Sequence, residues 1–238
     1  MQSRKIRRGE GTMECVVGLR VEPMRVERAG ESPDDPLAGV GIRTQSMSDL
    51  SNGYDEESEG FIANRSPTLG VAIVRSWARS LPAGSTVLEI GCGDGEPITR
   101  TLIQEGLSVH AVDASPKMVS AFRNNFPDTP VMCEAAAERL HDLDERFDAA
   151  LAWGLLFLLT PEAQKIVVCN VGNALNTGGR FLFTSPKEAV TWIDVRTGHE
   201  SVSLGAFEYK SLLSAANMSL IAEYDDEGSN HYFEAEKG

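Results

Sequence analysis

Three glycines alternate with other residues directly after a short apolar segment, in the sequence Gly91-Cys92-Gly93-Asp94-Gly95. Glycine lets the backbone turn tightly and approach a bound molecule, because it has no Cβ atom. A helix that follows such a turn offers free N–H groups and a positive dipole end to an anionic group. The spacing therefore indicates a ligand-binding loop, although a simple strand-to-helix turn also favours glycine.

Two carboxylates accompany this loop. Asp113 ends the apolar segment Val109-His110-Ala111-Val112 about twenty residues beyond the glycines, a spacing at which an acid can accept hydrogen bonds from both hydroxyls of a ribose. Asp113 could instead cap a helix, but Ser115-Pro116 already supplies a cap and a first helical residue. Glu89 lies inside Val87-Leu88-Glu89-Ile90, where a buried acid is costly unless it has partners, and an outward-facing position is the alternative.

The elements that must position these residues follow from hydrophobic periodicity. Apolar residues from Val71 to Leu81 recur at helical spacing, and a strand-helix rhythm follows them. The predicted strands are 86–90, 108–112, 131–133, 147–153, 180–184, 220–224 and 231–235, and the predicted helices are 98–104, one beginning at Pro116, 161–175 with Gly178-Gly179 as its stop, and 207–216. This alternation predicts an α/β fold with a Rossmann-like, doubly wound sheet, mostly parallel and seven-stranded, with one antiparallel strand near the edge. The ligand then binds beyond the carboxyl ends of the strands.

Charge and composition exclude several classes of partner. The chain carries a net charge of -13, and from Met47 onward 28 acidic residues face 14 basic ones. Such a domain repels phosphate groups, so nucleic acids and anionic membrane surfaces are not expected partners. The longest apolar run, Ala149 to Leu159, is too short to span a bilayer. The four cysteines, which include no C-x-x-C pair, suggest neither a metal site nor a disulfide framework and fit a cytoplasmic protein: Cys15, Cys92, Cys133 and Cys169.

The first part of the chain has a different character from the rest. Residues 1–46 show no sustained periodicity and have the composition of a linker, so we expect a disordered or dispensable extension, and Met47 is a candidate start codon. Residues 47–238 are expected to form one domain, with a helical lid over 47–82 and the Rossmann-like core over 83–238.

Four motifs together resemble the class I S-adenosylmethionine-dependent methyltransferase family of the small-molecule type. They are Val87-Leu88-Glu89-Ile90-Gly91-Cys92-Gly93-Asp94-Gly95, Ala111-Val112-Asp113-Ala114-Ser115, Phe147-Asp148-Ala149-Ala150 and Gly178-Gly179-Arg180-Phe181, and the likeness extends from about Tyr54 to the C-terminus. The resemblance implies that the glycine loop, with Gly91, Cys92, Gly93 and Gly95, packs against the methionyl part of S-adenosylmethionine. It also implies that Asp113, beside Ala114, binds the ribose and that Glu89 orients the loop and the ammonium side of the cofactor.

The chain departs from the family pattern at two places. Ala136 stands where the family often has an acid near the adenine amino group, so adenine recognition would fall to the backbone of Ala137 or to Glu138. After the fourth strand, Trp153 begins an apolar segment in place of the Asn-Pro-Pro-Tyr of amide and base methyltransferases. An apolar floor under the sulfonium points to a small-molecule acceptor, although Trp153 could equally be a core residue.

Methyl transfer from a sulfonium is an in-line displacement, which mainly requires alignment in a dry pocket. A general base is needed only for an acceptor that is protonated at working pH, and the candidates are His231, the weak first choice, Asp194 and Asp226. Tyr54 and Arg65 could cover the cofactor as part of a lid.

Two other functions compete with methyl transfer. An NAD-dependent oxidoreductase is the enzymatic alternative. However, the loop continues to Pro97 with no glycine that completes a G-x-G-x-x-G spacing, and no Tyr-x-x-x-Lys pair follows. A catalytically silent cofactor-binding subunit is the other. The sequence leaves open the acceptor, the atom methylated and the oligomeric state.

Overall fold

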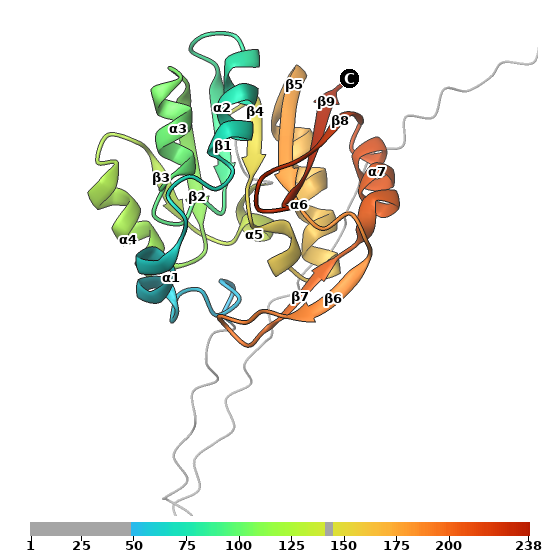
Figure 1. The fold of residues 1–238 in the computed structure, drawn as a ribbon. Coiled ribbons are helices and arrows are strands. Elements are labelled where there is room, and N and C mark those ends of the chain that lie inside the picture. Colours follow the sequence, from blue (N-terminus) through green and yellow to red (C-terminus); the bar gives the residue numbers. More distant parts are fainter. Residues whose placement is uncertain (1–48, 141–144) are drawn as a thin grey trace, which may run out of the picture. The chain divides into compact units, whose positions relative to one another are not determined.

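Helices and strands alternate along residues 49–140 and 145–238, the parts of the chain that the computed structural model describes. The predicted extension, residues 1–46, lies outside the described residues. In chain order the elements are α1 (Ser58–Asn64), α2 (Val71–Ser80), β1 (Thr86–Ile90), α3 (Ile98–Gln104), β2 (Ser108–Asp113), α4 (Pro116–Asn125), β3 (Val131–Cys133), α5 (Ala136–Arg139), β4 (Phe147–Ala152), η2 (Leu156–Leu158), α6 (Pro161–Ala174), β5 (Leu175–Thr184), β6 (Val190–Ile193), β7 (Glu200–Ser203), α7 (Gly205–Ala215), β8 (Met218–Asp225) and β9 (His231–Lys237) (Figure 1).

Seven of these strands form one sheet in the order β3-β2-β1-β4-β5-β9-β8. The pairs from β3 through β5 are parallel, whereas β9 runs antiparallel to both β5 and the edge strand β8. The prediction of a mostly parallel Rossmann-like sheet with one antiparallel strand near the edge is therefore confirmed. Because β1 and β2 are parallel neighbours, the glycine loop and Asp113 emerge at the same edge of the sheet.

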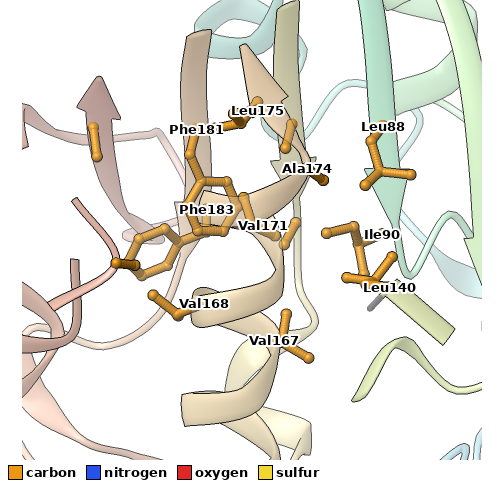
Figure 2. Packing of buried hydrophobic residues seen from close by; sticks show 14 of the residues in the cluster. Leu88, Ile90, Leu140, Val167, Val168, Val171, Ala174, Leu175, Phe181 and Phe183 are labelled. Atoms are coloured by element: carbon orange, nitrogen blue, oxygen red, sulfur yellow. The ribbon is translucent and has the colours of Figure 1, made fainter. Parts of the chain in front are cut away.

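Buried side chains alternate between the two faces of the sheet, as the period of a β-strand requires. On one face, Leu88 and Ile90 of β1 and Phe181 and Phe183 of β5 pack together with α6, as Figure 2 shows. On the other face, Val87 packs with buried residues of α2, α3 and α4. The two layers of helices hold the sheet rigid, so its carboxyl edge is a firm base for a ligand site.

The N-terminal residues divide between the core and the pocket side. Val74 and Trp77 of α2 are buried in the same cluster as α3 and α4, so this helix belongs to the layer that covers the sheet. Within the predicted lid, 47–82, only the residues before α2 are therefore placed to act as a cover.

Local signals set most element boundaries, and one prediction was wrong. The backbone N–H of Met118 donates to Ser115 Oγ at 3.1 Å, which confirms the predicted cap of α4. The helix predicted over 161–175 ends at Ala174, but the glycine pair predicted to stop it lies inside β5. The register between β4 and β5 is irregular there, and Gly178 has a left-handed φ of 76°, so the glycines serve a strand irregularity and not a helix stop.

The β6–β7 hairpin was not predicted. Val190 and Ile193 of β6 are 43% and 60% exposed, and the buried positions of β7 are the serines Ser201 and Ser203, so neither strand shows an alternation of apolar residues. Among the described helices, none combines the length and apolarity that crossing a bilayer requires.

Candidate functional site

A pocket of about 530 Å³ opens at the carboxyl ends of β1, β2 and β4. Its walls come from the glycine loop, from α5, from η2 and the start of α6, and from residues 50–61, which precede or belong to α1. The lining includes most residues that the sequence singled out for cofactor binding: Tyr54, Glu89, Gly91, Cys92, Gly93, Asp113, Ala114, Ala137, Glu138 and Trp153. Gly95 and Arg65 lie outside it.

The glycine loop takes a conformation that favours glycine at each of its three positions. Gly91, Gly93 and Gly95 have left-handed φ angles of 72°, 57° and 86°. A Cβ atom on Gly95 would lie 2.3 Å from the Phe126 ring, so this glycine serves packing beneath the loop. A Cβ atom on Gly93 would meet no atom within 4 Å, because this glycine borders the open pocket. Backbone can therefore approach a ligand closely at Gly93.

Asp113 joins the loop to the helix beyond it. The backbone N–H of Gly93 donates to Asp113 Oδ2 at 2.8 Å, and that of Ser115 donates to Oδ1 at 2.8 Å. Burial raises the pKa of Asp113, and these two hydrogen bonds oppose the rise. Each carboxylate oxygen has about two acceptor positions, so both retain capacity for a further donor on the pocket side.

Glu89 is buried beneath the loop, with only 2% of its surface exposed. Thr99 Oγ1 of α3 donates to Glu89 Oε2 at 2.6 Å, which supplies the partner that a buried acid requires. Burial raises the pKa of Glu89 to about 8, and the charge of Asp113 adds to the rise. A cationic ligand group in the pocket would favour the ionised carboxylate, which is the arrangement expected for an ammonium group.

Arg65 is held by a residue that sequence reasoning did not assign. Its guanidinium forms an ion pair with Asp94 of the glycine loop, whose side chain is buried. Asn125 Nδ2 donates to the Asp94 backbone oxygen at 3.0 Å. Arg65 therefore fastens the loop from outside the pocket, and nothing in the order of residues links two positions that are 29 apart.

Residues before α1 line the pocket and contact the β6–β7 hairpin behind them. Tyr54 lines the pocket, and its hydroxyl donates to Asp194 Oδ2 at 3.1 Å. Burial, together with the neighbouring Asp194 carboxylate, raises the pKa of Tyr54 to about 12, so the hydroxyl keeps its proton. The Arg196 guanidinium lies 5.6 Å from the centre of the Phe61 ring. In Figure 1 the hairpin and α1 lie at the same end of the sheet.

The remaining wall is apolar, and the sequence predicted only its first part, the apolar segment after the fourth strand. It consists of Phe157, Leu158, Leu159, Ala163 and Ile166, from η2 to α6. The ring of Phe157 packs against Trp192 of the hairpin with centroids 5.5 Å apart. The apolar run after β4 was visible in the sequence, but its contact with the unpredicted hairpin was not.

The three candidate bases lie outside the pocket lining. Both ring nitrogens of His231 contact carboxylates, Nδ1 with Asp225 at 2.8 Å and Nε2 with Glu223 at 3.2 Å. Asp194 accepts hydrogen bonds from Tyr54 and from the backbone N–H of Arg196 at 2.7 Å. The third candidate, Asp226, lies in the turn between β8 and β9. The structure thus gives each of these residues partners within the fold and brings none of them to the pocket wall.

Comparison with known proteins indicates what this chain is similar to. Residues 87–179 match the family model for a methyltransferase domain. An uncharacterised methyltransferase of Synechocystis is 26% identical over 152 residues, which cover 63% of this chain and 68% of that protein. A ubiquinone biosynthesis O-methyltransferase of Xanthomonas axonopodis is 26% identical over 151 residues, which cover 60% of this chain and 62% of that protein.

Solved structures share the fold. The Burkholderia thailandensis 1,6-didemethyltoxoflavin-N1-methyltransferase superposes with a TM-score of 0.61 and 20% identity, covering 77% of this chain and 84% of its own. An amino pentose methyltransferase of Micromonospora echinaspora gives a TM-score of 0.60 and 16% identity, covering 77% of this chain and 96% of its own. The matched segment, residues 87–179, spans the glycine loop, β2 and β4 in a sheet of this strand order, and these similarities together support a class I S-adenosylmethionine-dependent methyltransferase.

Proposed function

We propose that the protein transfers the methyl group of S-adenosylmethionine to an uncharged, largely apolar small molecule by in-line displacement. The observation that carries this proposal is the single pocket in which the glycine loop and Asp113 face an apolar wall of Phe157, Leu159 and Ile166. Its volume of about 530 Å³ falls within the range of small-molecule sites, roughly 300 to 1,000 Å³.

The residues of the cofactor end fit S-adenosylmethionine. Gly93 leaves open space at the backbone, Asp113 has acceptor capacity for ribose hydroxyls, and Glu89 is a buried acid placed to compensate a cation. Ala137 and Glu138, the residues proposed for adenine recognition, both line the pocket. When bound, the cofactor supplies an electrophilic methyl group on a sulfonium.

The charges around the pocket disfavour an anionic acceptor. The ionisable side chains that line it are carboxylates, Tyr54 and Cys92, and the described part of the lining holds no lysine, arginine or histidine. An anionic acceptor would find no counter-charge there, and the domain as a whole is acidic. The protein's contribution to the reaction is then to align the acceptor and to exclude water. Tyr54 stays protonated and donates its hydroxyl proton to Asp194, so it cannot serve as a general base.

The relatives point in the same direction. Two of them are a ubiquinone biosynthesis O-methyltransferase and a 1,6-didemethyltoxoflavin-N1-methyltransferase, and both names refer to small-molecule compounds. This supports an acceptor of that general size, and it assigns neither compound to this chain.

A thermal-shift comparison tests the cofactor. S-adenosylhomocysteine at 100 times its dissociation constant should add about 2.7 kcal/mol of stability, and NAD at the same concentration should add none. For a domain of this size the melting temperature should rise by about 2 to 4 °C per kcal/mol. A shift with NAD and none with S-adenosylhomocysteine would contradict the proposal.

An acceptor screen coupled to release of S-adenosylhomocysteine tests the acceptor class. Each uncharged aromatic amine, heterocycle or phenol is paired with a derivative that carries an added carboxylate. Turnover should be confined to the uncharged member of a pair. Binding of S-adenosylhomocysteine without turnover on any acceptor would support the catalytically silent subunit instead.

A further inference from the structure

Asp226 lies outside the pocket, yet it gathers donors that lead to two residues of the pocket wall. The hydroxyl of Tyr232 donates to Asp226 Oδ2 at 2.8 Å. Asn230 Nδ2 lies 3.1 Å from Oδ1 and 2.9 Å from Oδ2 of the same carboxylate. The backbone N–H groups of Gly228 and Asn230 donate to Oδ1, each at 2.9 Å. One carboxylate thereby fixes the whole turn between β8 and β9.

The direction of the hydrogen bonds through Tyr232 is determined by chemistry. An indole N–H can only donate and an ionised carboxylate can only accept, so the hydroxyl between them must accept from one and donate to the other. Trp153 Nε1 donates to the Tyr232 hydroxyl at 2.7 Å, and the hydroxyl donates onward to Asp226. Tyr232 is fully buried, so its hydroxyl cannot exchange these two partners for water.

The backbone at Gly70 covers the hydrogen bond between the two rings. A Cβ atom on Gly70 would lie 2.6 Å from Trp153 Nε1 and 2.7 Å from the Tyr232 hydroxyl oxygen. Gly70 also has a left-handed φ of 76°, so glycine is favoured at this position on both grounds. Close backbone packing keeps water away from the bond, which strengthens it.

We infer that Asp226 is a positioning residue, which holds the Trp153 indole through Tyr232 and the Asn230 side chain directly, and so fixes the orientation of two pocket-lining residues. Trp153 directly follows β4 and Asn230 precedes β9, and both line the pocket. The inference rests on the proposed function only in assigning the pocket to S-adenosylmethionine and its acceptor. It replaces the role of general base that the sequence suggested for Asp226.

Three variants and a matched control test this role in the full chain. Tyr232→Phe keeps the buried ring and removes the hydroxyl, and Asp226→Ala removes the acceptor. Asp226→Asn keeps one oxygen that can accept from Tyr232 and is the conservative variant. Glu227→Ala removes an exposed acid from the same turn, so it controls for the change of charge.

The first measurement is the indole N–H resonance of Trp153 in a chain with ¹⁵N-labelled tryptophan, assigned with Trp153→Phe. Tyr232→Phe and Asp226→Ala should shift this resonance and speed its exchange with water, and Asp226→Asn should restore it in part. The resonance of Trp77 should stay in place, and Glu227→Ala should change neither. An unchanged Trp153 resonance in Tyr232→Phe would overturn the inference.

The second measurement is calorimetric titration with S-adenosylhomocysteine. Tyr232→Phe and Asp226→Ala should weaken binding by about three- to tenfold, as expected for the loss of one positioning hydrogen bond. Affinity within 1.5-fold of wild type, with a displaced indole, would show that Trp153 is not positioned for the ligand and would overturn the inference. A wild-type chain that binds no S-adenosylhomocysteine would instead refute the proposed function, and the indole resonances would then decide the structural role of Asp226.

Discussion

Replacement of Asp113 by alanine should weaken binding of S-adenosylhomocysteine and also destabilise the protein without ligand. The structure shows two backbone N–H donors on this carboxylate, from Gly93 and Ser115, each at 2.8 Å. Asp113→Ala removes both acceptors, so the loop and the start of α4 lose their common partner.

The magnitudes follow from the hydrogen bonds that are lost. A hydrogen bond to a charged group contributes roughly 1.5 to 3 kcal/mol, and the cost of burying the carboxylate offsets part of the two lost here. The free energy of unfolding should therefore fall by about 1 to 3 kcal/mol. Two ribose hydroxyls that donate to the same carboxylate should give at least a tenfold loss of affinity, or about 1.4 kcal/mol.

Asp148→Ala is the matched control. Asp148 Oδ2 accepts a hydrogen bond from the backbone N–H of Thr86 at 2.9 Å, and the residue lies outside the candidate pocket. Its loss should lower the free energy of unfolding measured in urea by a similar amount, while calorimetric titration should find the affinity for S-adenosylhomocysteine unchanged.

A ligand analogue separates direct contact from a loosened loop. The 2′-deoxy analogue of S-adenosylhomocysteine should bind the wild-type protein at least about fivefold more weakly than the parent compound, and it should bind Asp113→Ala about equally. If Asp113→Ala weakens affinity no more than Asp148→Ala does, or discriminates the two ligands as the wild type does, the ribose assignment is refuted.

Other consequences can be measured on single variants. Because burial raises the pKa of Glu89 from its ordinary value of 4.5 to about 8, the folded state holds a proton that the unfolded state has lost, so stability of the unliganded protein should fall as the pH rises from about 4.5 through about 8. Glu89→Gln should flatten this part of the urea-unfolding profile, and an unchanged slope would contradict the buried acid. Gly95→Ala should lower the free energy of unfolding by more than about 1 kcal/mol, because the added methyl group would lie 2.3 Å from a buried ring. Gly93→Ala should lower it less, but should weaken the affinity for S-adenosylhomocysteine measured by calorimetry. The opposite ranking of the two variants would contradict the loop geometry. Tyr54→Phe removes the hydrogen bond to Asp194, so protease should cleave the residues before α1 faster than in the wild type in the presence of S-adenosylhomocysteine. Equal cleavage rates in the variant and the wild type would contradict a stabilising contact between this segment and the hairpin.

The sequence by itself determined the sheet and the base of the pocket. The apolar strand at Val87–Ile90, the glycines after it, Asp113 and the Ser115 cap are signals carried by a few neighbouring residues. Backbone propensity and hydrophobic period act over such short windows, and parallel strands bring their carboxyl ends to one edge wherever they form. The fold class and the location of the candidate site could therefore be predicted without coordinates.

Tertiary structure decided which side chains surround that base. Tyr54 contacts Asp194 across 140 residues, Arg65 pairs with Asp94, and Asp226 reaches Trp153 only through a third residue. The same packing places the three candidate bases outside the pocket lining. Contacts of this kind depend on how the helices and the hairpin pack on the sheet. That packing is determined by the side chains of the whole core, and it produces no periodic sequence pattern at the residues that make the contact.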